Sequence, residues 1–227
     1  NYGPDPTAPA IARRSNREPM TAPEDPTSPV VYIVDDNEDV RETLGLLFES
    51  VELEVETFAS ASAFLDAYPA GRPGCLIADV RMPGMSGLEL HEEMIRRAID
   101  LPVIIITGYG DIEMAVNVMK AGAADFIQKP YKEQDLLDRV QKAIGASVEA
   151  LRQSGEAERN CERLALLTPR EREVLDLIVA GEPNKRIAHQ MGLSEKTVEF
   201  HRANVMKKLE ARSLADLLKK AIAGRPT

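Results

Sequence analysis

Four short polar stretches of this chain together have the composition of a cation and phosphoryl site. They supply three carboxylates, one hydroxyl and one ammonium group, at Asp35-Asp36, Asp79, Thr107 and Lys129. Carboxylate oxygens are the donors that hard divalent cations such as Mg²⁺ prefer, and an ammonium group can bind phosphoryl oxygens. The residue types therefore predict chemistry on a phosphoryl group beside a divalent cation.

Each polar stretch follows an apolar run of strand length. The runs are 30–34 before the acid pair, 75–78 before Asp79, 103–106 before Thr107 and 126–127 before Lys129. Amphipathic helices are expected between them at about 37–50, 60–67, 87–97, 111–120 and 132–145. This alternation predicts an α/β domain with a five-stranded parallel sheet. Ligands bind at the carboxyl ends of such strands, so the polar stretches should meet at one edge.

The C-terminal part has the pattern of a small helical domain. Residues 168–171, Thr-Pro-Arg-Glu, form a capping box with proline at the first helical position. Helices are expected from Pro169 to about Ala180, at 184–191, and from Glu195 to about Leu209, which is helix-turn-helix spacing. The preceding stretch, 147–163, is expected to be a linker helix. Its apolar positions could pack on a partner copy, or it could be a solvated tether.

The last of these three helices has a core face and an outward face. A helical projection turns Val198, Val205 and Leu209 toward the core. Outward basic side chains suit phosphate contacts, whereas Glu199, Asn204 and Phe200 can meet base edges or a thymine methyl group. The residues expected to contact DNA are Lys196, Thr197, Glu199, Phe200, Arg202, Ala203, Asn204, Lys207 and Lys208. The alternative is a helical bundle whose basic face is merely solvated.

Charge is divided unevenly along the chain. Residues 164–227 contain 12 Lys and Arg and 8 Asp and Glu, so their net charge is +4. The rest of the chain has a net charge of −13, which gives the total of −9. Nucleic-acid binding therefore belongs to the C-terminal part. Residues 1–29 contain seven of the 15 prolines and are expected to be disordered.

The composition also limits the location of the protein. Cys75 and Cys161, the two cysteines, do not suggest a disulfide framework, which favours a reducing cytoplasm. No apolar run approaches the roughly 20 residues that span a bilayer, so no membrane partner is expected. His91 and His189 are expected on helix surfaces, and His201 is expected to pack or to contact phosphate.

The motifs resemble two known families. VDDNEDV, ADVRMPGMSG, ITGYGD and FIQKPY resemble the flavodoxin-like receiver domain of bacterial two-component response regulators. LTPREREVLDLIVAGEPNKRIAHQMGLSEKTVEFHRANVMKKL resembles the LuxR-type helix-turn-helix of the NarL/FixJ class, and is most similar to the FixJ subgroup. Together with the composition, the resemblance predicts a disordered N-terminal extension at 1–29, a receiver at 30–146, a linker helix at 147–163 and a LuxR-type DNA-binding domain at 164–227.

The resemblance also implies roles at the phosphoryl site. Asp79 would be the phosphoacceptor for a sensor histidine kinase. Asp36, Asp79 and the main-chain carbonyl of Arg81 would bind Mg²⁺, with Asp35 orienting its waters. Lys129 would pair with the phosphoryl oxygens, before a cis bond to Pro130. Thr107 and Phe126 would form a switch pair, with Phe126 at a position where many relatives carry tyrosine.

The implied function is phosphorylation-dependent transcription regulation. A homodimer formed on phosphorylation would bind two-fold-related half-sites in double-stranded DNA, with RNA polymerase as a further partner. One alternative is a phosphoryl relay or protein-binding switch whose tail is only a dimer module. A less favoured one is a phosphatase of the haloacid dehalogenase type. Such enzymes carry a second aspartate two positions after the nucleophile, where this chain has Arg81.

Overall fold

A computed structural model of the chain describes residues 28–108 and 122–224. The helix expected at 111–120 lies outside these ranges, as does nearly all of the N-terminal extension at 1–29. Packing divides the chain into two compact units, with the division between Leu151 and Arg152.

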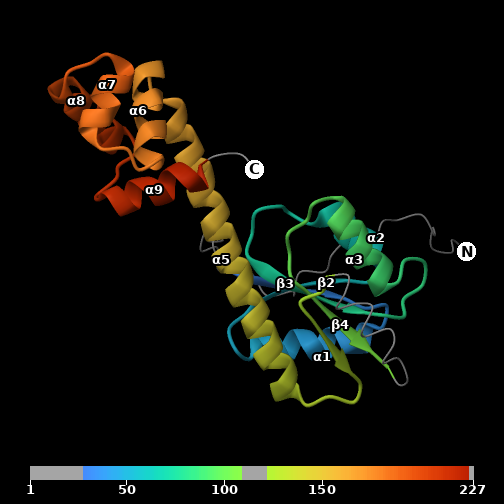
Figure 1. The fold of residues 1–227 in the computed structure, drawn as a ribbon. Helices are drawn as coiled ribbons and strands as arrows, with labels where there is room; N and C mark the ends of the chain where they lie inside the picture. The colour runs from blue at the N-terminus through green and yellow to red at the C-terminus, as the bar shows by residue number, and fades with distance from the viewer. Residues whose placement is uncertain (1–27, 109–121, 225–227) are drawn as a thin grey trace, which may run out of the picture. The chain divides into compact units, whose positions relative to one another are not determined.

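The first unit is built on a five-stranded parallel sheet (Figure 1). Its strands are β1 (Val30–Val34), β2 (Glu54–Phe58), β3 (Gly74–Asp79), β4 (Val103–Thr107) and β5 (Asp125–Gln128). The order β2-β1-β3-β4-β5 is the flavodoxin-like order. In the register, Val34 pairs with Ala78, Asp79 with Ile106, and Thr107 with Gln128. The strands therefore end together, and the predicted alignment of the polar stretches at one edge is confirmed.

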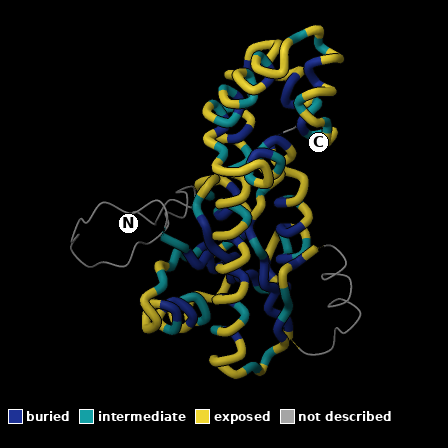
Figure 2. The backbone as a smooth tube through the Cα atoms, turned by 60° about the vertical axis from the view of Figure 1, so that its left-hand side comes forward, coloured by how far each residue is buried: buried dark blue, intermediate teal, exposed yellow. Residues whose placement is uncertain are grey.

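Helices cover both faces of this sheet. On one face, α2 (Ala61–Ala67) and α3 (Gly87–Arg96) pack against alternate strand residues such as Tyr32 and Leu76. On the other face, α1 (Glu38–Glu49) and the first turns of α5 (Glu133–Ala165) pack against the intervening strand residues, such as Ile33 and Ile77. All five β1 residues are buried because both faces are covered, and Figure 2 shows buried segments in dark blue inside the first unit.

The helix α5 (Glu133–Ala165) corrects one expectation. Sequence patterns predicted a helix at 132–145 and a separate linker helix at 147–163, but the structure has one continuous helix of 33 residues. No proline interrupts this stretch, and Gly145 is tolerated within a helix. The side chain of Ser147 is buried, and its Oγ accepts a hydrogen bond of 3.1 Å from the Gly74 N–H at the start of β3. Packing on the sheet therefore continues beyond the predicted end at 145.

The second unit contains the end of α5 and four further helices. These are α6 (Pro169–Val179), α7 (Asn184–Met191), α8 (Glu195–Lys208) and α9 (Leu214–Ala223). The first three match the expected helices, while α9 was not predicted. The Thr168–Glu171 capping box is present, and Gly192 ends α7 with a φ of 66°, a conformation that favours glycine. Val198, Val205 and Leu209 are fully buried, as the helical projection predicted.

The burial of His91 corrects a second expectation. His91 was expected at the surface but is only 6% exposed, because the α3 face that carries it packs within the first unit. Burial lowers the pKa of its imidazole.

Within the ranges that the structure describes, none of the helices combines the length and the apolar character needed to cross a membrane.

Candidate functional site

Lys129 joins two of the predicted carboxylates at the carboxyl edge of the sheet. Its Nζ lies 2.7 Å from Asp79 Oδ1, a hydrogen bond between the ends of β5 and β3. The same Nζ lies 3.8 Å from Asp35 Oδ2, just after β1. Asp36 is exposed beside Asp35. Residues 50 and 94 positions apart from Lys129 thus come together because three strands end at one edge.

The surroundings of these groups are unevenly charged. Burial raises the pKa of Asp35, although the Asn37 N–H and the Lys129 charge act in the opposite direction. Burial lowers the pKa of Lys129, but its hydrogen bond to Asp79 and the charges of Asp79 and Asp35 outweigh this and the pKa is raised. One ammonium group therefore faces the carboxyl groups of Asp79 and Asp35, and the exposed Asp36 lies next to Asp35. The cluster has a formal surplus of negative charge that a divalent cation would offset.

Main-chain groups fix the orientation of the Asp35 and Asp79 carboxylates. The Arg81 N–H donates to Asp79 Oδ2 at 2.7 Å, and the Asn37 N–H donates to Asp35 Oδ1 at 2.9 Å. Arg41 Nη1 donates to the main-chain oxygen of Asp35 at 2.7 Å, so α1 also positions the end of β1. Asp79 thus has one oxygen engaged by a backbone donor and the other by an ammonium group.

Gly87 brings the start of α3 against the backbone of Asp79. A Cβ atom at position 87 would lie 2.4 Å from the Asp79 carbonyl oxygen, much closer than a carbon atom can approach. The Gly87 N–H donates to the Val80 carbonyl oxygen at 3.2 Å. Sequence analysis did not identify this residue. The available signal was a glycine directly after Ser86, which caps α3.

The donor set fits Mg²⁺ bound with several water ligands. Across residues 28–108 and 122–224, no three Asp, Glu, His or Cys side chains are grouped closely enough to enclose a metal ion. Mg²⁺ does not require such a cage, because it commonly binds one or two carboxylates and retains waters. Asp35 and Asp79 already converge on one cationic group, Lys129 Nζ. The convergence shows that these carboxylates can share a cation.

Thr107 and Phe126 lie on the neighbouring strands β4 and β5. Thr107 is buried, and its main-chain oxygen accepts a 2.8 Å hydrogen bond from the Lys129 N–H. Phe126 is partly buried at the edge of the core that α2 and α3 cover. The main-chain oxygen of Phe126 accepts a hydrogen bond of 3.3 Å from Arg139 Nη1 of α5, and Arg139 is also paired with Asp125. The Lys129–Pro130 peptide bond is cis.

The outward face of α8 carries a mixed set of side chains. Phe200 is 64% exposed, and Lys196, Glu199, Ala203 and Lys207 are also exposed. Thr197, Arg202 and Asn204 are partly exposed, and the Thr197 and Ser194 hydroxyl groups lie 2.8 Å apart. The remaining predicted DNA contact, Lys208, is turned toward its own domain. Its Nζ donates to Glu171 Oε2 at 2.6 Å.

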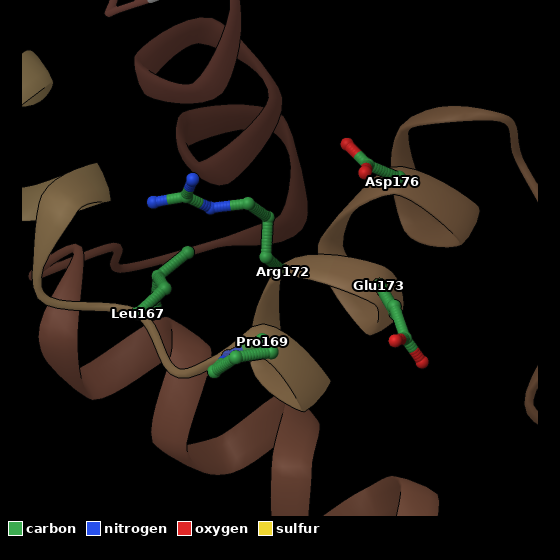
Figure 3. A pocket seen from close by; sticks show the side chains of 5 residues that line it. All are labelled: Leu167, Pro169, Arg172, Glu173 and Asp176. Carbon is green, nitrogen blue, oxygen red and sulfur yellow. The ribbon is translucent and has the colours of Figure 1, made fainter.

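A separate hollow lies beside the start of α6. Its lining residues are Leu167, Pro169, Arg172, Glu173 and Asp176 (Figure 3). In Figure 3 the Glu173 side chain points away from Leu167, and Glu173 is paired with Arg170. These groups do not converge on one point, so we assign no ligand to the hollow.

Two family descriptions match the two units. Residues 31–141 match "Response regulator receiver domain", and residues 165–221 match "Bacterial regulatory proteins, luxR family". The transcriptional regulatory protein FixJ of Azorhizobium caulinodans is 45% identical over 87% of this chain and 93% of its own length. This chain belongs to the FixJ-type response regulators.

Other relatives of this response regulator are similar over nearly their whole length. The transcriptional regulatory protein TdiR of Thauera aromatica is 42% identical over 88% of each chain. The solved structure of the response regulator StyR aligns with a TM-score of 0.75 and 45% identity, over 86% of this chain and 99% of that one. The solved structure of full-length FixJ from B. japonicum aligns with a TM-score of 0.54 and 39% identity, over 87% of this chain and 98% of that one. The response regulator is thus a phosphorylation-dependent regulator of transcription in a two-component system.

Proposed function

We propose that Asp79 is the residue that receives the phosphoryl group and that Lys129 stabilises the charge on it. The observation that carries this proposal is the 2.7 Å hydrogen bond from Lys129 Nζ to Asp79 Oδ1 at the carboxyl edge of the sheet. A carboxylate oxygen already adjacent to an ammonium group is suited to carry a new anionic group. The donor would be a phosphohistidine of a sensor histidine kinase.

The proposed transfer forms one bond and breaks one. An Asp79 carboxylate oxygen attacks phosphorus, and the bond from phosphorus to the histidine nitrogen breaks, leaving an acyl phosphate on Asp79. Lys129 moves from the carboxylate to the phosphoryl oxygens and offsets their charge. Asp36, Asp79 and the main-chain carbonyl of Arg81 would bind Mg²⁺, and Asp35 would orient its waters. When bound, the ion supplies charge neutralisation for the incoming phosphoryl group.

Phosphorylation of the full chain by acetyl phosphate in Mg²⁺ tests the acceptor assignment. The Asp79→Asn variant should gain no phosphoryl group in its intact mass, because an amide is not a competent nucleophile here. Asp100→Asn serves as a matched control, since Asp100 is an exposed aspartate before β4, at the opposite end of the strands. Persistent labelling of the Asp79→Asn variant would contradict the assignment.

We also propose that Thr107 and Phe126 transmit phosphorylation to a dimer surface. The phosphoryl group adds roughly −1.5 to −2 charge and new acceptor oxygens, one of which the Thr107 hydroxyl can meet. Movement of Thr107 would leave space for Phe126 to turn inward and favour dimerisation. On a sizing column with light scattering, a beryllofluoride mimic should raise the mass toward a dimer. A mass that remains monomeric at all concentrations would contradict this step.

The output that we propose is sequence-specific binding of α8 to double-stranded DNA. Lys196, Arg202 and Lys207 would contact phosphates, with Thr197 and Ala203 beside them. Glu199, Phe200 and Asn204 would contact bases. Two half-sites about one helical turn apart would suit a symmetric dimer, with RNA polymerase as a further partner in the cytoplasm.

Replacement of two outward lysines tests the DNA assignment. Lys196→Ala with Lys207→Ala should reduce retention of double-stranded DNA by the full chain by at least tenfold, because two phosphate contacts are lost. Lys219→Ala, an exposed lysine of α9, provides the matched control. Unchanged retention by the double variant would favour a relay or a protein-binding switch instead.

A further inference from the structure

Lys208 and its neighbour Lys207 have different environments at the end of α8. The Lys207 residue is exposed. Lys208 Nζ donates to Glu171 Oε2 at 2.6 Å and to the Leu166 main-chain oxygen at 3.0 Å. An ammonium group has three donors, so two of those on Lys208 are used within the domain. Its charge is therefore already partly satisfied before DNA is present.

Glu171 is the buried partner that fixes this arrangement. The residue is 4% exposed, and its Oε2 also accepts a 2.8 Å hydrogen bond from the Thr168 N–H in the capping box of α6. A buried carboxylate is unfavourable unless it is paired and hydrogen-bonded. The hydrogen bond from Lys208 is accordingly the main cause of the lowered pKa of Glu171. Separating Lys208 from Glu171 would leave that carboxylate charge buried and unpaired.

Two other contacts hold the same end of α8. Arg163 Nη2, in the last turn of α5, lies 2.5 Å from Glu210 Oε2. Lys220 Nζ of α9 donates to the Glu210 main-chain oxygen at 2.6 Å. Leu209, next to Glu210 in the sequence, is fully buried in the core of the unit. The end of α8 is thus held by side chains from three other helices.

We propose that Lys208 is a positioning residue for DNA recognition and makes no phosphate contact. It holds the end of α8 against the start of α6, and thereby fixes the direction in which Glu199 and Asn204 face the bases. This inference rests on the proposed function, because it assumes that α8 reads DNA. It removes one lysine from the nine predicted DNA contacts and gives that lysine a role in specificity.

Salt dependence separates the two roles of the adjacent lysines. The full chain with beryllofluoride is titrated with a mixed-sequence duplex at several salt concentrations, using fluorescence anisotropy. Each phosphate contact contributes about 0.9 to the slope of log affinity against log salt. Lys207→Gln should make this negative slope less steep by about 0.9 for each bound protomer. Lys208→Gln should leave the slope unchanged.

Specificity supplies the second measurement. The specificity ratio is the affinity for a duplex selected from random fragments divided by the affinity for the mixed-sequence duplex. We expect Lys208→Gln to lower this ratio by about tenfold. Lys208→Arg should retain the ratio because guanidinium can reach the same acceptors. The double variant Glu171→Gln with Lys208→Gln should recover part of it, since two amides can hydrogen-bond without leaving a buried charge. Circular dichroism checks that each variant is folded, and Lys208→Arg keeps the comparison usable if Lys208→Gln unfolds.

The outcomes separate failure of this inference from failure of the proposed function. A slope that falls equally in Lys207→Gln and Lys208→Gln would identify Lys208 as a phosphate contact and overturn the inference. A specificity ratio that is unchanged in Lys208→Gln would also overturn it. If the unsubstituted chain itself selects no DNA sequence, the proposed DNA-reading function fails instead.

Discussion

Two lysine–carboxylate pairs in this protein have nearly the same local geometry and different surroundings. Lys129 and Asp79 are 2.7 Å apart, with side chains 36% and 14% exposed, while Lys208 and Glu171 are 2.6 Å apart, with side chains 33% and 6% exposed. Beside the first pair lie the further carboxylates Asp35 and Asp36. The second pair is hydrogen-bonded to the Thr168 N–H and to the Leu166 main-chain oxygen. Distance and exposure alone do not distinguish them.

The difference lies in charge balance. The pair at Asp79 belongs to a cluster with more carboxylates than cationic groups. Binding of a metal ion and a phosphoryl group can therefore change which groups Lys129 contacts. The pair at Glu171 is neutral, and its carboxylate accepts hydrogen bonds from Lys208 and from the Thr168 N–H of the capping box. A charge-balanced, hydrogen-bonded pair favours one structure, whereas an unbalanced cluster favours a change of ligand. We therefore expect perturbation of the first pair to affect chemistry and perturbation of the second to affect folding.

The largest expected effect is on phosphoryl uptake. Lys129→Met should slow labelling by acetyl phosphate about 100-fold, because one preorganised donor to the developing charge is lost. Intact-mass kinetics of the full chain measure the rate. The Lys132→Met variant, which replaces an exposed lysine just before α5, should match the unsubstituted chain. An unchanged rate in Lys129→Met would mean that both lysine pairs are structural.

The second effect concerns folding of the C-terminal unit. Glu171→Ala should lower its free energy of unfolding by about 2 kcal/mol, since it removes a capping hydrogen bond and leaves Lys208 unpaired. Urea unfolding with hydrogen exchange of the α6 and α8 amides gives this value. Glu173→Ala on the exposed side of the same helix should change it by less than about 0.5 kcal/mol. Equal losses in the two variants would remove the distinction between a buried and an exposed glutamate.

Mg²⁺ should distinguish the two units. At ten times its dissociation constant, a ligand stabilises the state that binds it by about 1.4 kcal/mol. We expect this gain in the unit that contains Asp79 and none in the unit that contains Glu171. Hydrogen exchange with and without Mg²⁺ measures both in one sample. Asp36→Asn should reduce the gain, and a gain of equal size in both units would argue against a specific ion site.

The smallest effect is a dependence of folding on pH. The folded-state pKa of Glu171 is lowered from the usual 4.5, mainly by the hydrogen bond from Lys208. The stability that ionised Glu171 contributes is therefore present above pH 4.5 and is lost as the pH falls through the lower folded value. Thermal unfolding from pH 7 to pH 3 should show the advantage of the unsubstituted chain over Glu171→Gln decreasing with acid. A stability difference between the two proteins that stays constant from pH 7 to pH 3 would show that ionised Glu171 does not contribute to the pH dependence.

Sequence patterns predicted the elements that depend on local periodicity. The strands, the capping box of α6 and the buried face of α8 follow from residue spacing. The destination of Lys208 could not be predicted in the same way, because its partner lies 37 positions earlier and two consecutive lysines look alike in sequence. The burial of His91 has the same origin in tertiary packing. The missed helix α9 had a local signal, since Ser213 caps it by accepting from the Asp216 N–H.

The close approach of Gly87 to Asp79 has a consequence for mutational tolerance. A side chain at position 87 would overlap the Asp79 carbonyl oxygen, so substitutions there should reduce the amount of folded protein in a cell, whatever the stimulus. Substitutions at exposed Asp36 should leave abundance nearly normal and abolish the response. In a library of single variants scored once for abundance and once for reporter output, position 87 would be depleted in both scores and position 36 in only the second.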